Sequence, residues 1–176
     1  MSTLIVDTVR TDTIQDEAGA FEHAKLVQVV NTMVSATATG TTTVPEDDTI
    51  PQKTEGDEYM TLAITPTHAS NKLLIEVVCC CSHGNSGVPA VVALFQDADA
   101  GAIAAISFSN YDTNDVWPGS FVHYMTTGTT SSTTFRVRAG KNPAGSNAFV
   151  FNGTIGTGRL LGGVMASSIT ISEIRV

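Results

Sequence analysis

Short β-prone runs recur along this chain at regular intervals, and this spacing constrains the fold more than any other feature of the sequence. The runs are rich in Val, Ile, Phe, Tyr and Thr, and clusters of Gly, Asn, Asp and Pro typical of turns separate them. Apolar spacing of three and four is not sustained for ~11 residues anywhere, so no helix is expected. The expected strands are residues 59–65, 72–81, 90–95, 102–109, 120–126, 133–139, 148–152 and 167–176.

The run from Thr133 to Ala139 indicates what kind of sheet these strands form. Phe135 and Val137 alternate with two arginines, so one face of the strand is buried and the other is in contact with water. About eight to ten short strands at this spacing predict an all-β fold, a two-sheet antiparallel sandwich or jelly roll. The length of 176 residues suits one such domain.

The first 23 residues differ in character from the rest. A β-prone apolar strip near the start consists of Leu4, Ile5, Val6 and Val9. The polar, turn-prone stretch 11–19 separates this strip from the later strands. We therefore predict an extended N-terminal arm over residues 1–23 and a jelly-roll β-sandwich over 24–176. A lone strand exposes unpaired N–H and C=O groups, so we expect the arm to pair with a sheet edge of another subunit.

The charge balance excludes several classes of partner. The chain has 17 acidic and 9 basic residues and a net charge of −8, the wrong sign for binding a phosphate backbone. Charged residues make up only 15% of the chain, so 25 threonines and 14 serines must supply much of the polar surface. No apolar run approaches the ~18 residues of a membrane-spanning helix. We expect no nucleic-acid partner and no membrane contact.

The N-terminus and the cysteines point to an intracellular site of synthesis. Asp7 interrupts the opening segment before a secretory apolar stretch could form, so no signal peptide is expected. Cys79, Cys80 and Cys81 are adjacent and close no loop, so we predict reduced, mostly buried thiols, with Cys80 pointing to the opposite face.

Two sequence motifs suggest a metal-binding site, but each lacks a feature that metal coordination requires. On a straight strand the side chains of Cys79, Cys81 and His83 repeat every ~6.8 Å, whereas the sulfurs of a tetrahedral zinc site lie about 3.8 Å apart. Only a bend at Cys81 would allow zinc. Residues 97–101 open like a calcium loop, but Phe108 stands where a bidentate Glu belongs, so we expect a polar turn.

Other polar motifs are expected to be loops. Asp47 and Asp48 are typical of a solvated loop, although such carboxylates can also bind a cation or a partner's lysine. Asn152-Gly153-Thr154 is a formal glycosylation sequon that we interpret as a tight turn. No nucleophile, base or carboxylate pair can be proposed from spacing, so we expect no enzyme, no cofactor and no metal.

Several segments, taken in order, resemble structural proteins of marine and freshwater phage virions. These segments are residues 1–9, 64–75, 119–124, 133–138 and 168–174. The resemblance covers most of the chain and implies a homotrimeric β-sandwich similar in general form to C1q/TNF-like heads. It implies no catalytic motif. Proteins of this kind include capsid decoration (cement) proteins and tail-fibre tips, and they are located in the virion.

Two roles are compatible with this resemblance. The chain is short and has neither heptads nor Gly-X-Y repeats, which favours a trimeric decoration protein that bridges the major capsid protein or another virion protein. The alternative is a tail fibre or receptor-binding tip, in which loops around Trp117 bind a host glycan; a buried core Trp would not support it. Candidates for the core and trimer contact are Ile169, Ile171, Ile174 and Val176.

Overall fold

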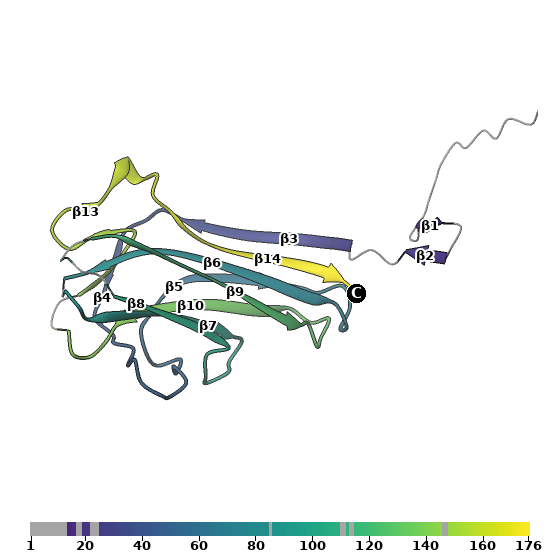
Figure 1. Cartoon of the computed structure of the whole chain (residues 1–176), viewed down its shortest axis with the longest axis horizontal. Coiled ribbons are helices and arrows are strands. Elements are labelled where there is room, and N and C mark those ends of the chain that lie inside the picture. The colour runs from purple at the N-terminus through teal and green to yellow at the C-terminus, as the bar shows by residue number, and fades with distance from the viewer. Residues whose placement is uncertain are drawn as a thin grey trace, which may run out of the picture.

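The computed structural model describes most of the chain (Figure 1). The described residues are 14–16, 19–21, 25–84, 86–109, 112, 115–145 and 148–176, and the first two stretches are described as backbone only. Leu4, Ile5, Val6 and Val9 of the predicted arm lie outside the described residues. Within the segment assigned to the arm, strands β1 (Ile14–Asp16) and β2 (Gly19–Phe21) form an antiparallel hairpin.

The regular secondary structure in the rest of the described chain consists of strands and one short 3-10 turn, η1 (Leu161–Gly163). The strands are β3 (Lys25–Val34), β4 (Ala38–Gly40), β5 (Asp57–Ile64), β6 (Lys72–His83), β7 (Pro89–Gln96), β8 (Ala104–Ser109), β9 (Trp117–Thr126), β10 (Thr133–Lys141), β11 (Phe149–Phe151), β12 (Gly153–Thr154), β13 (Gly158–Arg159) and β14 (Ser167–Arg175). Each strand expected from the sequence is present, and its boundaries differ by at most three residues. The predicted all-β fold is confirmed.

Two antiparallel sheets form a sandwich, as predicted (Figure 1). The first sheet has the order β5-β10-β7-β8. In the second sheet, β6 pairs along one edge with β9 and along the other with β14 and then β11. The strands β3 and β4 pair with β14 and β11 in turn. The second sheet is therefore four strands wide, in the order β3-β14-β6-β9 over most of its length.

The core lies between the two sheets and follows the alternation of the strands. Phe135 and Val137 of β10 have no exposed surface, and Ile169 and Ile171 of β14 face them from the second sheet with none either. The ring of Tyr59 on β5 stacks on that of Phe151, with centroids 4.7 Å apart. Burying one large aliphatic or aromatic side chain contributes about 1.5–3 kcal/mol, so this shared layer holds the sheets together.

Candidate interaction surface

The outer face of the first sheet is covered over its middle by the chain itself, whereas outward side chains of the edge strands β5 and β8 are exposed. Loop 41–56 runs along this sheet, and the backbone N–H of Val44 donates to the carbonyl of Lys141 at 3.0 Å. Gly140 lies under the loop, where a Cβ atom would stand 2.5 Å from the carbonyl oxygen of Thr42, so only glycine allows this approach. As a result even outward side chains of β7, such as Phe95, are buried.

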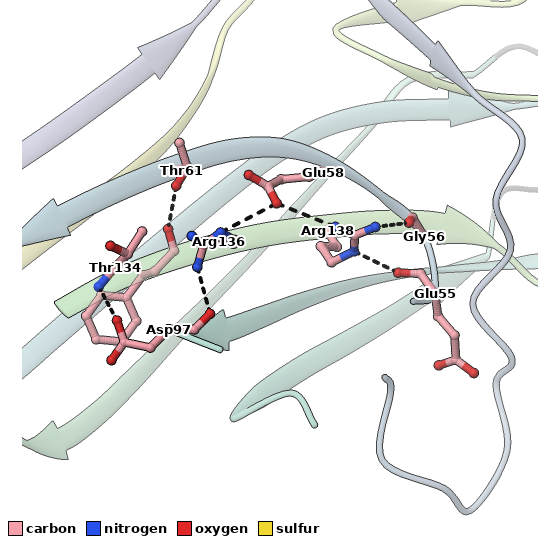
Figure 2. Close-up of polar contacts among 9 residues, drawn as sticks. Glu55, Gly56, Glu58, Thr61, Asp97, Thr134, Arg136 and Arg138 are labelled. Atoms are coloured by element: carbon pink, nitrogen blue, oxygen red, sulfur yellow. Dashed lines mark hydrogen bonds and ion pairs between the residues drawn. The ribbon is translucent and has the colours of Figure 1, made fainter. Parts of the chain in front are cut away.

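Two arginines of β10 fasten loops to the same face (Figure 2). Arg138 donates to the carbonyls of Glu55 at 3.0 Å and Gly56 at 2.7 Å, and Arg136 donates to the carbonyl of Asp97 at 2.7 Å. Both guanidinium groups also lie within 4 Å of the Glu58 carboxylate, at 3.7 and 3.5 Å. The arginines face outward as the sequence predicted. Their contacts with loop carbonyls assign them a structural role.

The outer face of the second sheet is different, because no loop of the described chain covers its centre. Its outward side chains form four rows that cross β3, β14, β6 and β9, and we call these sixteen positions the bare face. The rows are Met33, Ser168, Val78 and Ser120; Asn31, Thr170, Glu76 and Val122; Val29, Ser172, Leu74 and Tyr124; and Leu26, Ile174, Lys72 and Thr126.

Half of the bare face is apolar, and much of that apolar surface is exposed to solvent. Met33 is 69% exposed, Val122 59%, Leu26 58% and Tyr124 54%. These four side chains lie on the outer strands β3 and β9, with polar and apolar residues of β14 and β6 between them. A concentration of exposed apolar side chains on one face is typical of an interaction surface. The bare face is therefore the strongest candidate functional surface among the described residues.

A loop rich in apolar residues continues the bare face at the end where β14 begins. Residues 155–166 include η1, and Leu161 and Val164 are 73% and 83% exposed. Leu161 has a positive φ of 48°, which costs a non-glycine residue about 1–2 kcal/mol. The loop carbonyl of Ala166 lies 3.7 Å from the Cys80 Sγ, on the outward side of β6.

A buried carboxylate that sequence reasoning missed fixes the opposite end of β14. Glu173 has no exposed surface, and its carboxylate accepts hydrogen bonds from Asn71 Nδ2 (2.6 Å), Gln28 Nε2 (2.6 Å), and both the backbone N–H (2.9 Å) and hydroxyl (2.8 Å) of Thr67. Burial by itself would raise the pKa of Glu173, but the hydrogen bonds from Asn71, Gln28 and Thr67 outweigh it and lower the pKa to about 2. The ionised carboxylate thus ties loop 65–71 and β3 to β14.

Asn152 has a similar structural role at the other end of the sheet. It adopts a left-handed φ of 52° directly before Gly153, consistent with the predicted tight turn. Its amide donates to the carbonyls of Val34 and Ala36, and its side-chain oxygen accepts from the Ser167 hydroxyl at 2.7 Å. Only 1% of Asn152 is exposed, so the sequon is inaccessible in the folded chain.

The cysteines alternate as the sequence predicted. All three are free thiols; Cys79 and Cys81 are buried and Cys80 is half-buried on the opposite face. The Cys81 Sγ lies 3.9 Å from the carbonyl oxygen of Cys79 and 3.8 Å from that of Trp117. The described residues hold no group of three or more His, Cys, Asp or Glu that could bind a metal ion.

The other predicted contact residues are scattered. Ile169 and Ile171 lie in the chain's own core, whereas Ile174 is on the bare face and Val176 is 63% exposed. Trp117 is half-buried at an inward position of β9, beside Cys81, and its indole nitrogen is buried without a hydrogen-bond partner among the described residues. The structure therefore does not bring Trp117 together with the four C-terminal residues in one site.

The acidic loop forms only an open hollow. Asp47 and Asp48 lie at a depression of about 430 Å³ between residues 47–51 and 102–105. The Asp47 carboxylate already accepts hydrogen bonds from the N–H (2.9 Å) and hydroxyl (2.5 Å) of Thr49. It thus stabilises its own turn, as expected for a solvated loop. In the part of the chain that the structure describes, no helix is long and apolar enough to span a membrane.

Comparison with known proteins gives distant fold similarities and assigns no family. No family model and no curated protein matches the chain. The C-terminal domain of EclA, a sugar-binding protein, matches 80% of this chain over 86% of its own, with a TM-score of 0.35 and 15% identity. Dimeric latent PorU from Porphyromonas gingivalis matches 93% of this chain over 14% of its own, with a TM-score of 0.40 and 10% identity.

A viral protein is among the other similar structures. The VP2 subviral particle of infectious bursal disease virus matches 93% of this chain over 44% of its own, with a TM-score of 0.37 and 10% identity. The chain spans less than half the length of VP2 and of PorU.

Proposed function

We propose that this chain is a structural protein of a bacteriophage virion, made in the host cytoplasm, and that it decorates the capsid as a non-enzymatic homotrimer. The observation that carries the proposal is the bare face, because a broad, exposed, partly apolar sheet surface provides contact area rather than chemistry. The sequence resemblance to virion proteins supports the same role. Contacts of this kind stabilise a shell because symmetry repeats them many times.

The N-terminal arm is the proposed attachment element. Leu4, Ile5, Val6 and Val9 would add as a strand to a sheet edge of the major capsid protein or another virion protein. Deleting residues 1–20 should leave a folded head, judged by its circular dichroism and oligomeric state, that no longer binds particles stripped of the protein. If the truncated chain decorates particles as well as the full chain, the attachment surface lies on the head.

A receptor-binding tail tip is the alternative role, and it depends on Trp117. A glycan stacks on an exposed aromatic face, but Trp117 is half-buried and points into the sandwich, so the structure offers no specific support for this alternative. Copy number separates the two roles. A decoration protein should be present in purified virions at hundreds of copies, whereas a tail tip should be present at a few dozen at most.

A further inference from the structure

The bare face is uncovered in the described chain, and its charged residues indicate what kind of partner contacts it. Glu76 and Lys72 are the two charged residues among its sixteen positions, so the face has no net charge. The chain as a whole has a net charge of −8, which the remaining surface must carry. We propose that the bare faces of copies of this chain turn toward one another around the three-fold axis of the proposed homotrimer, so that the occupant of each face is another copy of the same chain. This inference deepens the proposed function by naming a partner of that surface.

The distribution of charge favours a second copy over an unrelated partner. A basic partner would be attracted to the acidic remainder of the molecule rather than to a neutral face. Two copies repel one another over most of their surfaces, and this repulsion is least where the neutral faces meet. Each face also presents one carboxylate and one ammonium group, which another copy of the same face can match. Among the described residues, neither Lys72 nor Glu76 is engaged in an ion pair.

The size of the bare face is adequate for a specific contact. One outward position of a sheet occupies about 4.8 by 6.8 Å, so four rows of four positions cover roughly 520 Å² in projection. A specific interface buries roughly 800 Å² of accessible surface on each partner. Projecting side chains have more accessible area than their projection, and the adjoining loop adds Leu161 and Val164. The bare face and this loop together therefore provide contact area of the same order as a specific interface.

The contrast between the two sheets supports the same conclusion. The first sheet has the middle of its outer face covered by loop 41–56, and Arg138 binds this loop and forms an ion pair with Glu58. In this sheet a loop of the same chain thus covers the buried outward side chains. The second sheet has apolar outward side chains and no such cover among the described residues, which is expected if another copy supplies it.

Charge reversal on the bare face gives the most specific test. Lys72→Glu leaves two negative charges on the face, and Glu76→Lys leaves two positive charges. Each variant alone should self-associate about 10-fold more weakly than the wild type in sedimentation experiments, the equivalent of one interfacial ion pair. An equimolar mixture of the two should recover much of the association, because two of the three contacts in a mixed trimer join oppositely charged faces, and the double variant should behave as the wild type.

Matched controls separate this effect from the total charge. Lys53→Glu and Asp99→Lys make the same charge changes in exposed loops of the first sheet, so they alter only the long-range repulsion. Lys53→Glu should weaken association much less than Lys72→Glu does, and Asp99→Lys should strengthen it slightly. Glu76→Lys brings the net charge closer to zero, so a whole-molecule charge effect would strengthen association. Only an effect of the bare face predicts that Glu76→Lys weakens it.

An apolar position provides an independent test. Val122→Asp places a charge on the bare face at a side chain that is already 59% exposed, so the fold should tolerate it. We expect at least ~10-fold weaker self-association, whereas Ile50→Asp, at a 63% exposed position of loop 41–56, should have no effect.

Three results would overturn the inference. The first is a wild-type chain that is monomeric at ~100 µM, a concentration well above the micromolar dissociation constants of ordinary contacts. The others are self-association that Val122→Asp does not change, and self-association that does not recover when the two charge variants are mixed. A monomeric chain would also contradict the homotrimer of the proposed function. Failure of the virion role alone is distinguishable, because it appears as loss of particle binding or low copy number in virions while self-association stays intact.

Discussion

Glu173 is a carboxylate without exposed surface, and its ionised form is part of what holds the second sheet to loop 65–71. Its folded-state pKa of about 2 lies below its ordinary value of 4.5. The stability that it contributes is therefore fully present above pH 4.5 and is lost as the pH falls toward 2. A shift of this size corresponds to about 3 kcal/mol of unfolding free energy at neutral pH.

Glu173→Gln tests this contribution. The amide cannot accept hydrogen bonds from all of the present donors, because its NH₂ group would replace either the oxygen that accepts from Gln28 or the oxygen that accepts from Asn71 and Thr67. We expect a loss of about 3 kcal/mol at pH 7, measured by denaturant unfolding, and a smaller difference from the wild type at pH 2.5–3. Asp99→Asn, in the exposed β7–β8 turn, is the control and should differ from the wild type by less than about 0.5 kcal/mol. Equal stability of Glu173→Gln and wild type at pH 7 would contradict the assignment.

The three thiols should differ in reactivity although they are adjacent. Burial raises the pKa of both Cys80 and Cys81, and the thiolate is the reactive form, so labelling at neutral pH should be slow. Cys80 alone is half-buried rather than buried. A thiol reagent should therefore modify one cysteine per native chain and three in denaturant. Cys80→Ser should abolish the native reaction; rapid labelling of a second thiol in this variant would contradict the structure.

At the scale of elements, one side chain of β10 holds a loop in place. Arg138→Gln would remove the charged donor from the carbonyls of Glu55 and Gly56, so loop 41–56 should open more often. We expect faster proteolytic cleavage within this loop at unchanged secondary structure, detected by mass spectrometry of the fragments. Arg136→Gln is the matched control, because Arg136 instead donates to Asp97. Equal cleavage in both variants would show that Arg138 does not secure the loop.

The sequence could predict the strands because each carries local signals. Alternation in β10 and the turn residues between strands are short-range features, so strand positions and fold class followed from them. The pairing of β6 with β14 could not be predicted, because it joins residues almost a hundred positions apart. Glu173 was missed for the same reason: its donors Gln28 and Asn71 are distant in sequence.

The bare face was missed although the sequence contains a signal for it. Its strands have apolar residues at consecutive positions, such as Leu73-Leu74 in β6 and Phe121-Val122 in β9. In a strand, neighbouring side chains point to opposite faces, so one residue of each pair must lie outside the core. The interpretation that each strand has one face in the core and one polar face in water does not account for the second apolar residue of each consecutive pair. Doubled apolar residues in several paired strands predict a sheet with two apolar faces.

At the scale of the whole molecule, the charge of −8 and the neutral bare face predict how self-association depends on salt. Two copies that meet through neutral faces gain apolar burial but must bring their acidic surfaces close together. Salt screens this long-range repulsion, since the Debye length falls from about 10 Å at 0.1 M to about 3 Å at 1 M. Salt also screens the attraction between Lys72 of one copy and Glu76 of another. This attraction involves one pair of charges at each contact, whereas the repulsion involves all of the remaining charges.

We therefore expect self-association to strengthen as sodium chloride rises from about 0.05 M to about 0.5 M, a range over which the Debye length shrinks roughly threefold. Sedimentation velocity over a concentration series at each salt level measures the dissociation constant. The double variant Lys72→Glu with Glu76→Lys keeps both the net charge and the neutral face, so its salt dependence should match that of the wild type. Association that weakens steeply with salt would mean that oppositely charged surfaces form the contact, and the bare face would then not be the main interface.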